Sequence, residues 1–158
     1  MTSAHEDPFD LSRFEQAQAK DFSHALAELR AGKKQTHWIW YVLPQLRGLG
    51  SSSRAIFYGI GSAQEAEAYL AHPVLGSRLR ECVAAMNALA GLSAVQVLGA
   101  IDAAKFRSCL TLFRSVDPGN VVFSEALDKY FAGVPDEASL ALLSASKHGL
   151  QPDARRRA

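Results

Sequence analysis

The chain has 158 residues, enough for one domain with a substantial hydrophobic core. Hydrophobic residues make up 48% and charged residues 21%, which excludes a disordered chain, and no apolar run is long enough to span a bilayer. Because 17 Lys and Arg nearly balance 16 Asp and Glu, giving a net charge of +1, we expect neither general nucleic-acid binding nor membrane binding.

Apolar residues recur at steps of three and four along most of the chain, which predicts helices. A first helix is expected to begin at Leu11 after an Asp10 cap, and a second to end before Gly32. The segment 36–44 leaves two alternatives. Thr36 can cap a short helix that ends before Pro44, while residues 39–43 also have the composition of a strand.

The middle of the chain alternates short helices with Gly, Ser and Pro boundaries. A short helix is expected over residues 53–58, after a loop rich in Gly and Ser. Ser62 and Glu65 have the spacing of a capping box that opens a helix as far as Ala71. A longer helix follows from Pro73 to Gly91.

The last third repeats this pattern. One or two helical turns are expected over residues 93–99, and Asp102 is expected to cap the next helix. The buried stripe of that helix is predicted to contain Phe106, Cys109, Leu110 and Phe113. A turn over residues 117–120 and helices over 123–133 and 135–143 complete the chain.

About eight mostly short helices with brief connections predict an all-α fold, a single compact domain over residues 7–145. We expect residues 1–6 and 146–158 to be flexible tails. Cys82 and Cys109 lie on apolar helical faces without metal-ligand spacing, so buried thiols in a reducing compartment are expected, and with them a cytoplasmic protein. The polar, acidic first ten residues lack the pattern of a secretory signal.

Residues 36–45 have the most unusual composition in the chain. They contain both tryptophans together with a histidine, a tyrosine and a glutamine, and these residues are His37, Trp38, Trp40, Tyr41 and Gln45. A segment that only filled a core would use Leu, Ile and Val, whereas each polar tip here needs a partner if it is buried. This pattern is typical of a small-molecule pocket wall. The alternative is that His37 and Trp38 tie together a helical core.

Asp102 and Lys105 are three residues apart and share one face of the predicted helix. They can be a cap and a solvent-facing lysine. They can also open onto a pocket, where Lys105 binds a phosphate and Asp102 acts as a base or electrostatic partner. The loop over residues 48–53 offers donors to phosphate but lacks the P-loop motif, so a simple turn is the alternative. No motif of a covalent nucleophile or metal enzyme occurs, and we expect neither cofactor nor metal.

Several segments follow one another in the order found in a known family. They are Asp10–Phe14 with Ala17 and Gln18, Ala25–Leu29 with Gly32–Lys34, His37–Tyr41 with Pro44 and Gln45, Ala68–Gly76 with Arg78 and Leu79, Asp102 with Lys105–Ser108, and Leu110–Phe113. Together they resemble domain-of-unknown-function family 1810, a bacterial family without an assigned activity, over roughly residues 7–143. Some members carry the label calpastatin-like, which implies a disordered inhibitor, and the helical periodicity here argues against it.

A weaker similarity links the chain to the all-α N-glycosidases that act on ADP-ribose-type and riboflavin-pathway substrates. It rests on the abundance of helices, the early aromatic segment and the pair Lys105-Phe106. The similarity implies a metal-independent hydrolase that cleaves an N-glycosidic bond in a nucleotide- or ADP-ribose-like molecule. At the level of fold alone it transfers no mechanism.

Three hypotheses follow for the function. In the first, the chain is such an enzyme, with Asp102, His37 and Glu28 as catalytic residues acting on a phosphate-bearing ligand. The ligand-binding residues would be Trp38, Trp40, Tyr41, Gln45, Lys105 and Ser108. In the second, the same pocket binds a nucleotide, another small ligand or a partner helix without catalysis. In the third, these side chains only hold the helical core together.

Overall fold

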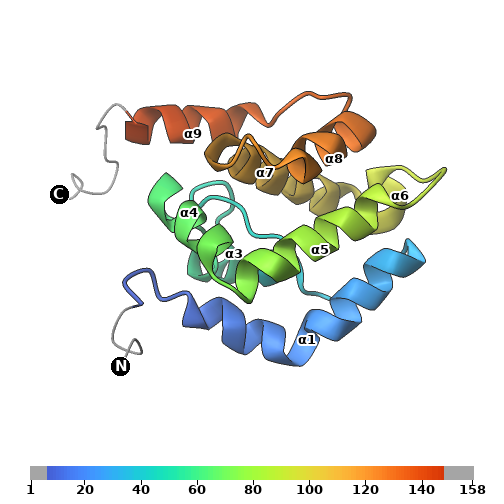
Figure 1. Ribbon diagram of the computed structural model, residues 1–158, viewed down its shortest axis with the longest axis horizontal. Coiled ribbons are helices and arrows are strands. Elements are labelled where there is room, and N and C mark those ends of the chain that lie inside the picture. Colours follow the sequence, from blue (N-terminus) through green and yellow to red (C-terminus); the bar gives the residue numbers. More distant parts are fainter. Residues whose placement is uncertain (1–6, 148–158) are drawn as a thin grey trace.

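The computed structural model describes residues 7–147, which form nine α-helices and no β-strand within that range (Figure 1). The helices are α1 (Ser12–Ala31), α2 (Ile39–Val42), α3 (Ser53–Phe57), α4 (Ala63–Ala71), α5 (Leu75–Asn87), α6 (Ala94–Leu98), α7 (Ala100–Val116), α8 (Val121–Phe131) and α9 (Glu137–Lys147). The expected all-α fold is confirmed. The limits 7–145 for the domain stay a prediction, and of the expected tails, residues 1–6 and 148–158 lie outside the described residues.

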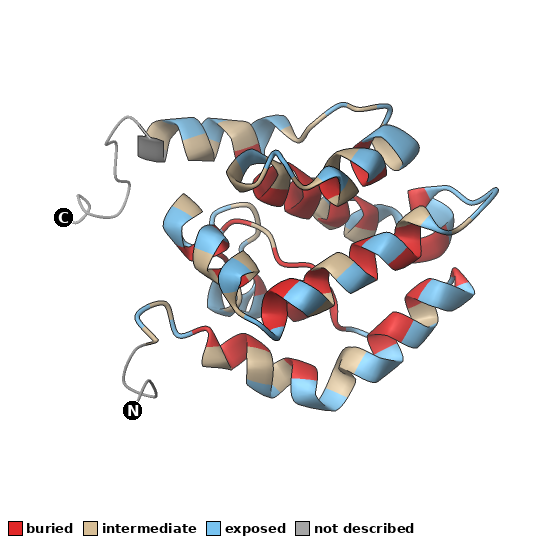
Figure 2. Cartoon of the chain, in the orientation of Figure 1, coloured by how far each residue is buried: buried red, intermediate tan, exposed pale blue. Residues whose placement is uncertain are grey.

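Helix α7 is the centre of the packing. It contacts α4, α6, α8 and α9, while α5 lies between α1 and α8 (Figure 1). Figure 2 shows that buried residues are concentrated on α7 and on the inner faces of α1 and α5. The predicted stripe of Phe106, Cys109, Leu110 and Phe113 is fully buried. Because α7 is packed on several sides, the side chains on its first turns are held in fixed positions.

Both cysteines are buried and free, as expected. Burial raises the pKa of Cys82 to about 12 and also raises that of Cys109. Both therefore remain thiols at neutral pH.

The N-terminal region differs from the sequence prediction in two ways. Residues 12–31 form one continuous helix, because no Gly or Pro interrupts them and propagation of an existing helix is favourable. The N-cap residue of this helix is Leu11, and the carboxylate of Asp7, four residues earlier, accepts hydrogen bonds from the amides of Leu11 (2.7 Å) and Ser12 (3.0 Å). Asp10, the expected cap, lies in a turn with φ of 55°. The predicted end at Gly32 is confirmed, with φ of 77°.

The ambiguous segment 36–44 contains a short helix, α2, so the helical alternative is correct. Thr36 does not cap it, because α2 starts after Trp38 without a side-chain cap. Asp102 does not cap α7 either. That helix begins at Ala100 after Gly99, whose φ of 87° suits glycine, and Asp102 lies within the first turn.

Ser52, Ser62 and Ser93 cap α3, α4 and α6 by accepting backbone hydrogen bonds. The predicted capping box at Ser62 is only half formed. The Ser62 hydroxyl accepts from the Glu65 amide at 3.0 Å, but the Glu65 carboxylate bonds Arg13 and the Gly61 amide instead. A partner distant in sequence has replaced the local one.

The segment from Leu46 to Ile60, which contains α3, is closed at its base. Leu46 and Ile60 form an isolated parallel bridge, in which the Arg47 amide donates to the Ile60 carbonyl (2.8 Å) and the Ile60 amide donates to the Gln45 carbonyl (2.9 Å). The bridge therefore fixes both ends of the segment that contains α3, and its second hydrogen bond holds the backbone of Gln45 at the start of that segment.

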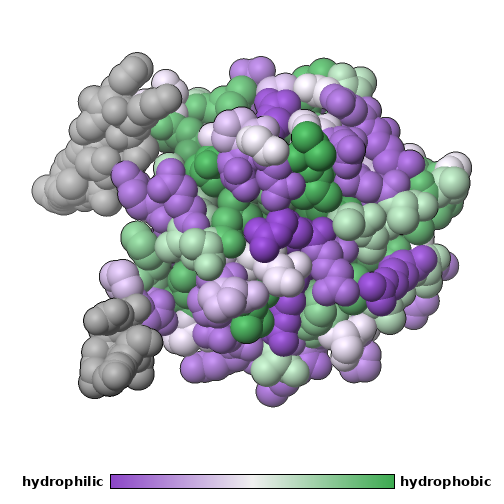
Figure 3. All heavy atoms as spheres, viewed as in Figure 1, coloured by the Kyte–Doolittle hydropathy of each residue, from purple (hydrophilic) through white to green (hydrophobic). Residues whose placement is uncertain are grey.

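The face shown in Figure 3 intersperses hydrophilic and hydrophobic side chains. It presents neither a uniformly charged nor a uniformly apolar surface. Among the described residues, none of the helices has the length and apolar character needed to cross a bilayer.

Candidate functional site

An open pocket of about 560 Å³ lies between the loop after α2, the first half of α7 and the start of α9. We call it the α7 pocket. Its lining residues are Gln45, Leu49, Gly50, Ala100, Ile101, Ala104, Lys105, Ser108, Asp136 and Ala138. Its volume falls within the range of small-molecule sites, and its wall combines small apolar residues with four polar side chains.

Gln45 and Lys105 reach this pocket from distant parts of the chain. They also line a much smaller neighbouring pocket of about 10 Å³, together with Trp40 on α2. The Lys105 ammonium lies 6.0 Å from the centre of the Trp40 ring, and the Arg54 guanidinium lies 4.9 Å from it. Residues from segments 36–45 and 102–108 therefore lie together here, namely Gln45, Trp40 and Lys105, whereas His37, Trp38 and Asp102 line neither pocket.

The Asp102 carboxylate sits between two lysines. It lies 2.9 Å from the Lys34 ammonium and 3.8 Å from that of Lys105. Lys34 also donates to the Thr36 carbonyl at 2.6 Å and lies over the Trp38 ring, so its side chain is only 7% exposed. Two positive charges therefore share one negative charge, and the more weakly paired of the two belongs to Lys105. Asp102 is not among the residues lining the α7 pocket.

Glu28 holds the loop that follows α1. Its carboxylate accepts from the amides of Gln35 (2.9 Å) and Thr36 (3.1 Å), the Thr36 hydroxyl (2.7 Å) and the Trp38 indole (2.8 Å). Burial alone would raise its pKa, but these hydrogen bonds outweigh burial and lower the pKa to about 2. All four donors come from one loop, which makes Glu28 an anchor for that loop.

The aromatic residues around Glu28 face different parts of the molecule. Trp38 is 1% exposed, and its ring lies in the core. His37 is exposed and lines neither the α7 pocket nor the small pocket beside it. The Tyr41 hydroxyl donates to the Asp21 carboxylate and its ring lines a third hollow, between α1 and α3. Of the predicted binding residues, Gln45, Lys105 and Ser108 meet in the α7 pocket.

Two residues of this region were not predicted from the sequence. Lys34 gave no signal, because its partner Asp102 is distant in the chain. Asp136 follows Pro135 at a predicted helix start, a signal for a cap, and its carboxylate does accept from the Ser139 amide (2.8 Å) and hydroxyl (2.7 Å). Its position on the pocket wall depends on how α9 packs against α7.

The remaining polar groups of the site are arranged locally. The Ser108 hydroxyl donates to the Ala104 carbonyl at 3.2 Å within α7, which leaves its oxygen able to accept a further bond. Gly50 comes so close to Ala55 that an added Cβ would lie 2.9 Å from the Ala55 Cβ. Within residues 7–147, no group of three or more His, Cys, Asp or Glu is placed to hold a metal ion.

Comparisons with known proteins give one family model and one similar crystal structure. The model of the family described as protein of unknown function (DUF1810) matches residues 8–143. The crystal structure of the conserved hypothetical protein Rv1873 from Mycobacterium tuberculosis is similar, with a TM-score of 0.86 and 48% sequence identity. The match covers 87% of this chain and 99% of that one. No curated protein matches, and neither finding shows a link to N-glycosidases.

Proposed function

We propose that this chain, which belongs to the DUF1810 family of proteins of unknown function, binds a small phosphate-bearing molecule in the α7 pocket. The observation that carries the proposal is the convergence of the Lys105 ammonium and the Gln45 side chain on one pocket wall. Filling a core does not require a cation and an amide from two distant segments to face the same open space.

The charge of Lys105 is available to a ligand. Asp102 lies nearer to Lys34, so the Lys105 ammonium keeps most of its positive charge uncompensated, and its side chain is 22% exposed. Lysine binds phosphate as a point charge, and because Lys105 is partly exposed, this attraction should weaken as salt is added. The negative part of the ligand therefore belongs at the Lys105 end of the pocket.

The other polar groups suit a sugar. Asp136 accepts hydrogen bonds, Ser108 has a free lone pair, and Gln45 offers both a donor and an acceptor. No aromatic ring lines the α7 pocket, so stacking of a planar base plays no part in binding there. These features favour a sugar phosphate as the ligand class.

The geometry supports binding better than hydrolysis. A general base must reach a water molecule with a free lone pair. Glu28 spends its carboxylate on four hydrogen bonds, Asp102 is paired with lysine, and His37 faces another part of the surface. Cleavage of an N-glycosidic bond stays a prediction of the fold-level similarity. The carboxylate on the wall of the α7 pocket is that of Asp136, whose Oδ2 already accepts two hydrogen bonds from Ser139.

The test is calorimetric titration of the full chain with ribose 5-phosphate and with inorganic phosphate. We expect ribose 5-phosphate to bind, and Lys105→Met to weaken binding by about tenfold or more, as loss of a charged hydrogen bond should. Lys129→Met is the matched control, because Lys129 is an exposed lysine on α8 away from the pocket. Equal binding by the Lys105 and Lys129 variants, or no binding at all, would contradict the proposal.

A second measurement separates binding from catalysis. ADP-ribose and NAD are incubated with the protein, and the products are resolved by chromatography. Our proposal expects no release of base or ribose. Turnover that is lost in Asp102→Asn would instead favour the hydrolase.

A further inference from the structure

We propose that the hollow between α1 and α3 is a second ligand site and takes a planar aromatic anion. This α1–α3 groove has a volume of about 450 Å³. Its lining residues are Arg13, Gln16, Ala17, Lys20, Asp21, Tyr41, Arg54, Phe57 and Tyr58. It shares none of them with the α7 pocket, so this inference does not depend on the proposed function.

Aromatic rings form one wall of the groove. The Tyr58 ring lies 5.1 Å from the Tyr41 ring and 4.8 Å from the Phe57 ring, the latter at an interplanar angle of 84°. Phe57 is 54% exposed although it is next to this cluster. Large apolar side chains normally turn inward, so an aromatic ring left open beside two others suits stacking or edge contacts with a planar ligand.

The charge at the groove is positive. Lys20 and Arg54 are exposed, and neither makes an ion pair with any other described residue. The one carboxylate in the lining belongs to Asp21, and it already accepts the Tyr41 hydroxyl. The Arg54 guanidinium also lies over the Trp40 ring, outside the groove, which leaves Lys20 as the less engaged of the two cations. Cations and aromatic rings that line the same groove favour a ligand that carries both a ring and a negative group.

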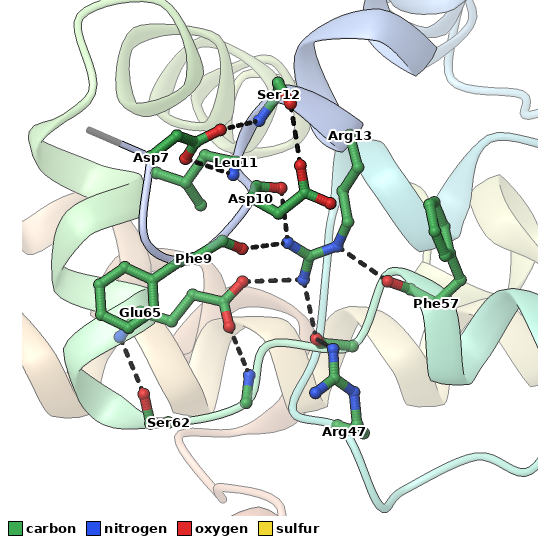
Figure 4. A network of polar contacts seen from close by, with 12 residues as sticks. Asp7, Phe9, Asp10, Leu11, Ser12, Arg13, Arg47, Phe57, Ser62 and Glu65 are labelled. Carbon is green, nitrogen blue, oxygen red and sulfur yellow. Dashed lines mark hydrogen bonds and ion pairs between the residues drawn. The ribbon is translucent and has the colours of Figure 1, made fainter. Parts of the chain in front are cut away.

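A network centred on the buried Arg13 borders the groove and is shown in Figure 4. The Arg13 guanidinium donates to the Phe57 carbonyl (2.8 Å) and the Gly59 carbonyl (3.1 Å), and it pairs with Glu65 at 2.8 Å. Arg47 donates to the Ile56 carbonyl at 3.0 Å. The Arg13 bonds fix the end of α3 against the start of α1, so the two sides of the groove are held in place before a ligand arrives.

The probe is AMP, compared with adenosine and with ribose 5-phosphate. All titrations use the Lys105→Met background, so that the α7 pocket does not contribute. We expect AMP to bind at least about tenfold more tightly than adenosine, which lacks the anion, and than ribose 5-phosphate, which lacks the ring. AMP that binds no better than adenosine, or does not bind, overturns this inference.

Variants locate the site. Adding Lys20→Met should weaken AMP binding about tenfold and leave adenosine binding unchanged. Phe57→Ser should weaken the binding of both ligands. Phe57 is half exposed, so thermal unfolding should show that its replacement folds normally. Lys129→Met is again the control. If AMP binds equally to the Lys20 and Lys129 variants, the groove is not the site, whereas ribose 5-phosphate binding to the unaltered chain would still uphold the α7 pocket.

Discussion

The Arg13 network and the Asp102 cluster are two charged regions with different designs. Arg13 and Glu65 are each 6% exposed, one cation faces one carboxylate, and the guanidinium also bonds backbone carbonyls. In the second region two lysines share Asp102, and Lys105 is partly exposed at a pocket. The first arrangement is closed and satisfied. The second leaves a charge available.

This difference separates a structural role from a binding role. A buried ion pair with all its hydrogen bonds made fixes chain segments, and removing one partner leaves an uncompensated buried charge. A partly exposed lysine that is only weakly paired with a carboxylate contributes little to folding stability, and its ammonium can bind an anion. Burial, charge balance and free hydrogen-bonding capacity together decide which role a cluster has.

The largest effect is expected at the closed network. Arg13→Ala should lower the free energy of unfolding by about 3–5 kcal/mol, because Glu65 would remain buried without its partner. The control is Arg30→Ala, which removes an ion pair with Glu81 whose side chains are 62% and 45% exposed, and it should cost less than about 1 kcal/mol. Urea unfolding measures both. Similar losses for the two variants would break the comparison.

An intermediate effect is expected at Glu28. Glu28→Gln should lower stability at pH 7 by about 1–2 kcal/mol, because a charged acceptor of four hydrogen bonds is replaced by a neutral one. The folded-state pKa of about 2 lies below the usual 4.5, so the contribution of the carboxylate is complete above pH 4.5. It should then be lost as pH falls toward 2.

The measurement for Glu28 is unfolding of both proteins between pH 7 and pH 2. The difference between the unaltered chain and Glu28→Gln should shrink below pH 4.5, whereas a difference that grows would contradict the assignment. Glu67→Gln, at an exposed position on α4, is the matched control and should show no such dependence.

The smallest effect is expected at Lys105. Lys105→Met should change the free energy of unfolding by less than about 1 kcal/mol, since its ammonium is 3.8 Å from Asp102 and partly hydrated. Lys34→Met should cost more, because the Lys34 side chain is almost fully covered and bonds both Asp102 and the Thr36 carbonyl. Chemical denaturation of the Lys105→Met and Lys34→Met variants measures both free energies of unfolding. A larger loss for Lys105 would make it a structural residue.

Local features of this fold were predictable from the sequence, because they depend on residues a few positions apart. The buried stripe of α7 follows from spacing of three and four residues, and the cap at Ser62 follows from its place before a helix. The caps expected at Asp10, Thr36 and Asp102 do not form. The two expected N-terminal helices proved to be one, because no Gly or Pro interrupts residues 12–31.

Polar partners between distant segments were not predictable. The sequence indicates that the Trp38 indole needs an acceptor, but not that Glu28 supplies it and turns the ring into the core. Glu65 was expected to complete a capping box with Ser62. Its carboxylate pairs with Arg13 instead, because the fold brings the start of α1 next to the start of α4. Tertiary packing therefore decided which aromatic residues were available to a ligand.

The bridge between Leu46 and Ile60 fixes both ends of the segment between them. Its ends are joined by two backbone hydrogen bonds, and Arg13 ties its second half to α1, so the exposed turn before α3 is the part that can change length. The cost of a longer closed loop grows slowly, by about 0.6 kcal/mol for each doubling of length. Insertions at the exposed Ser51 are thus a route by which relatives, or a designer, can reshape the mouth of the α7 pocket on an unchanged scaffold.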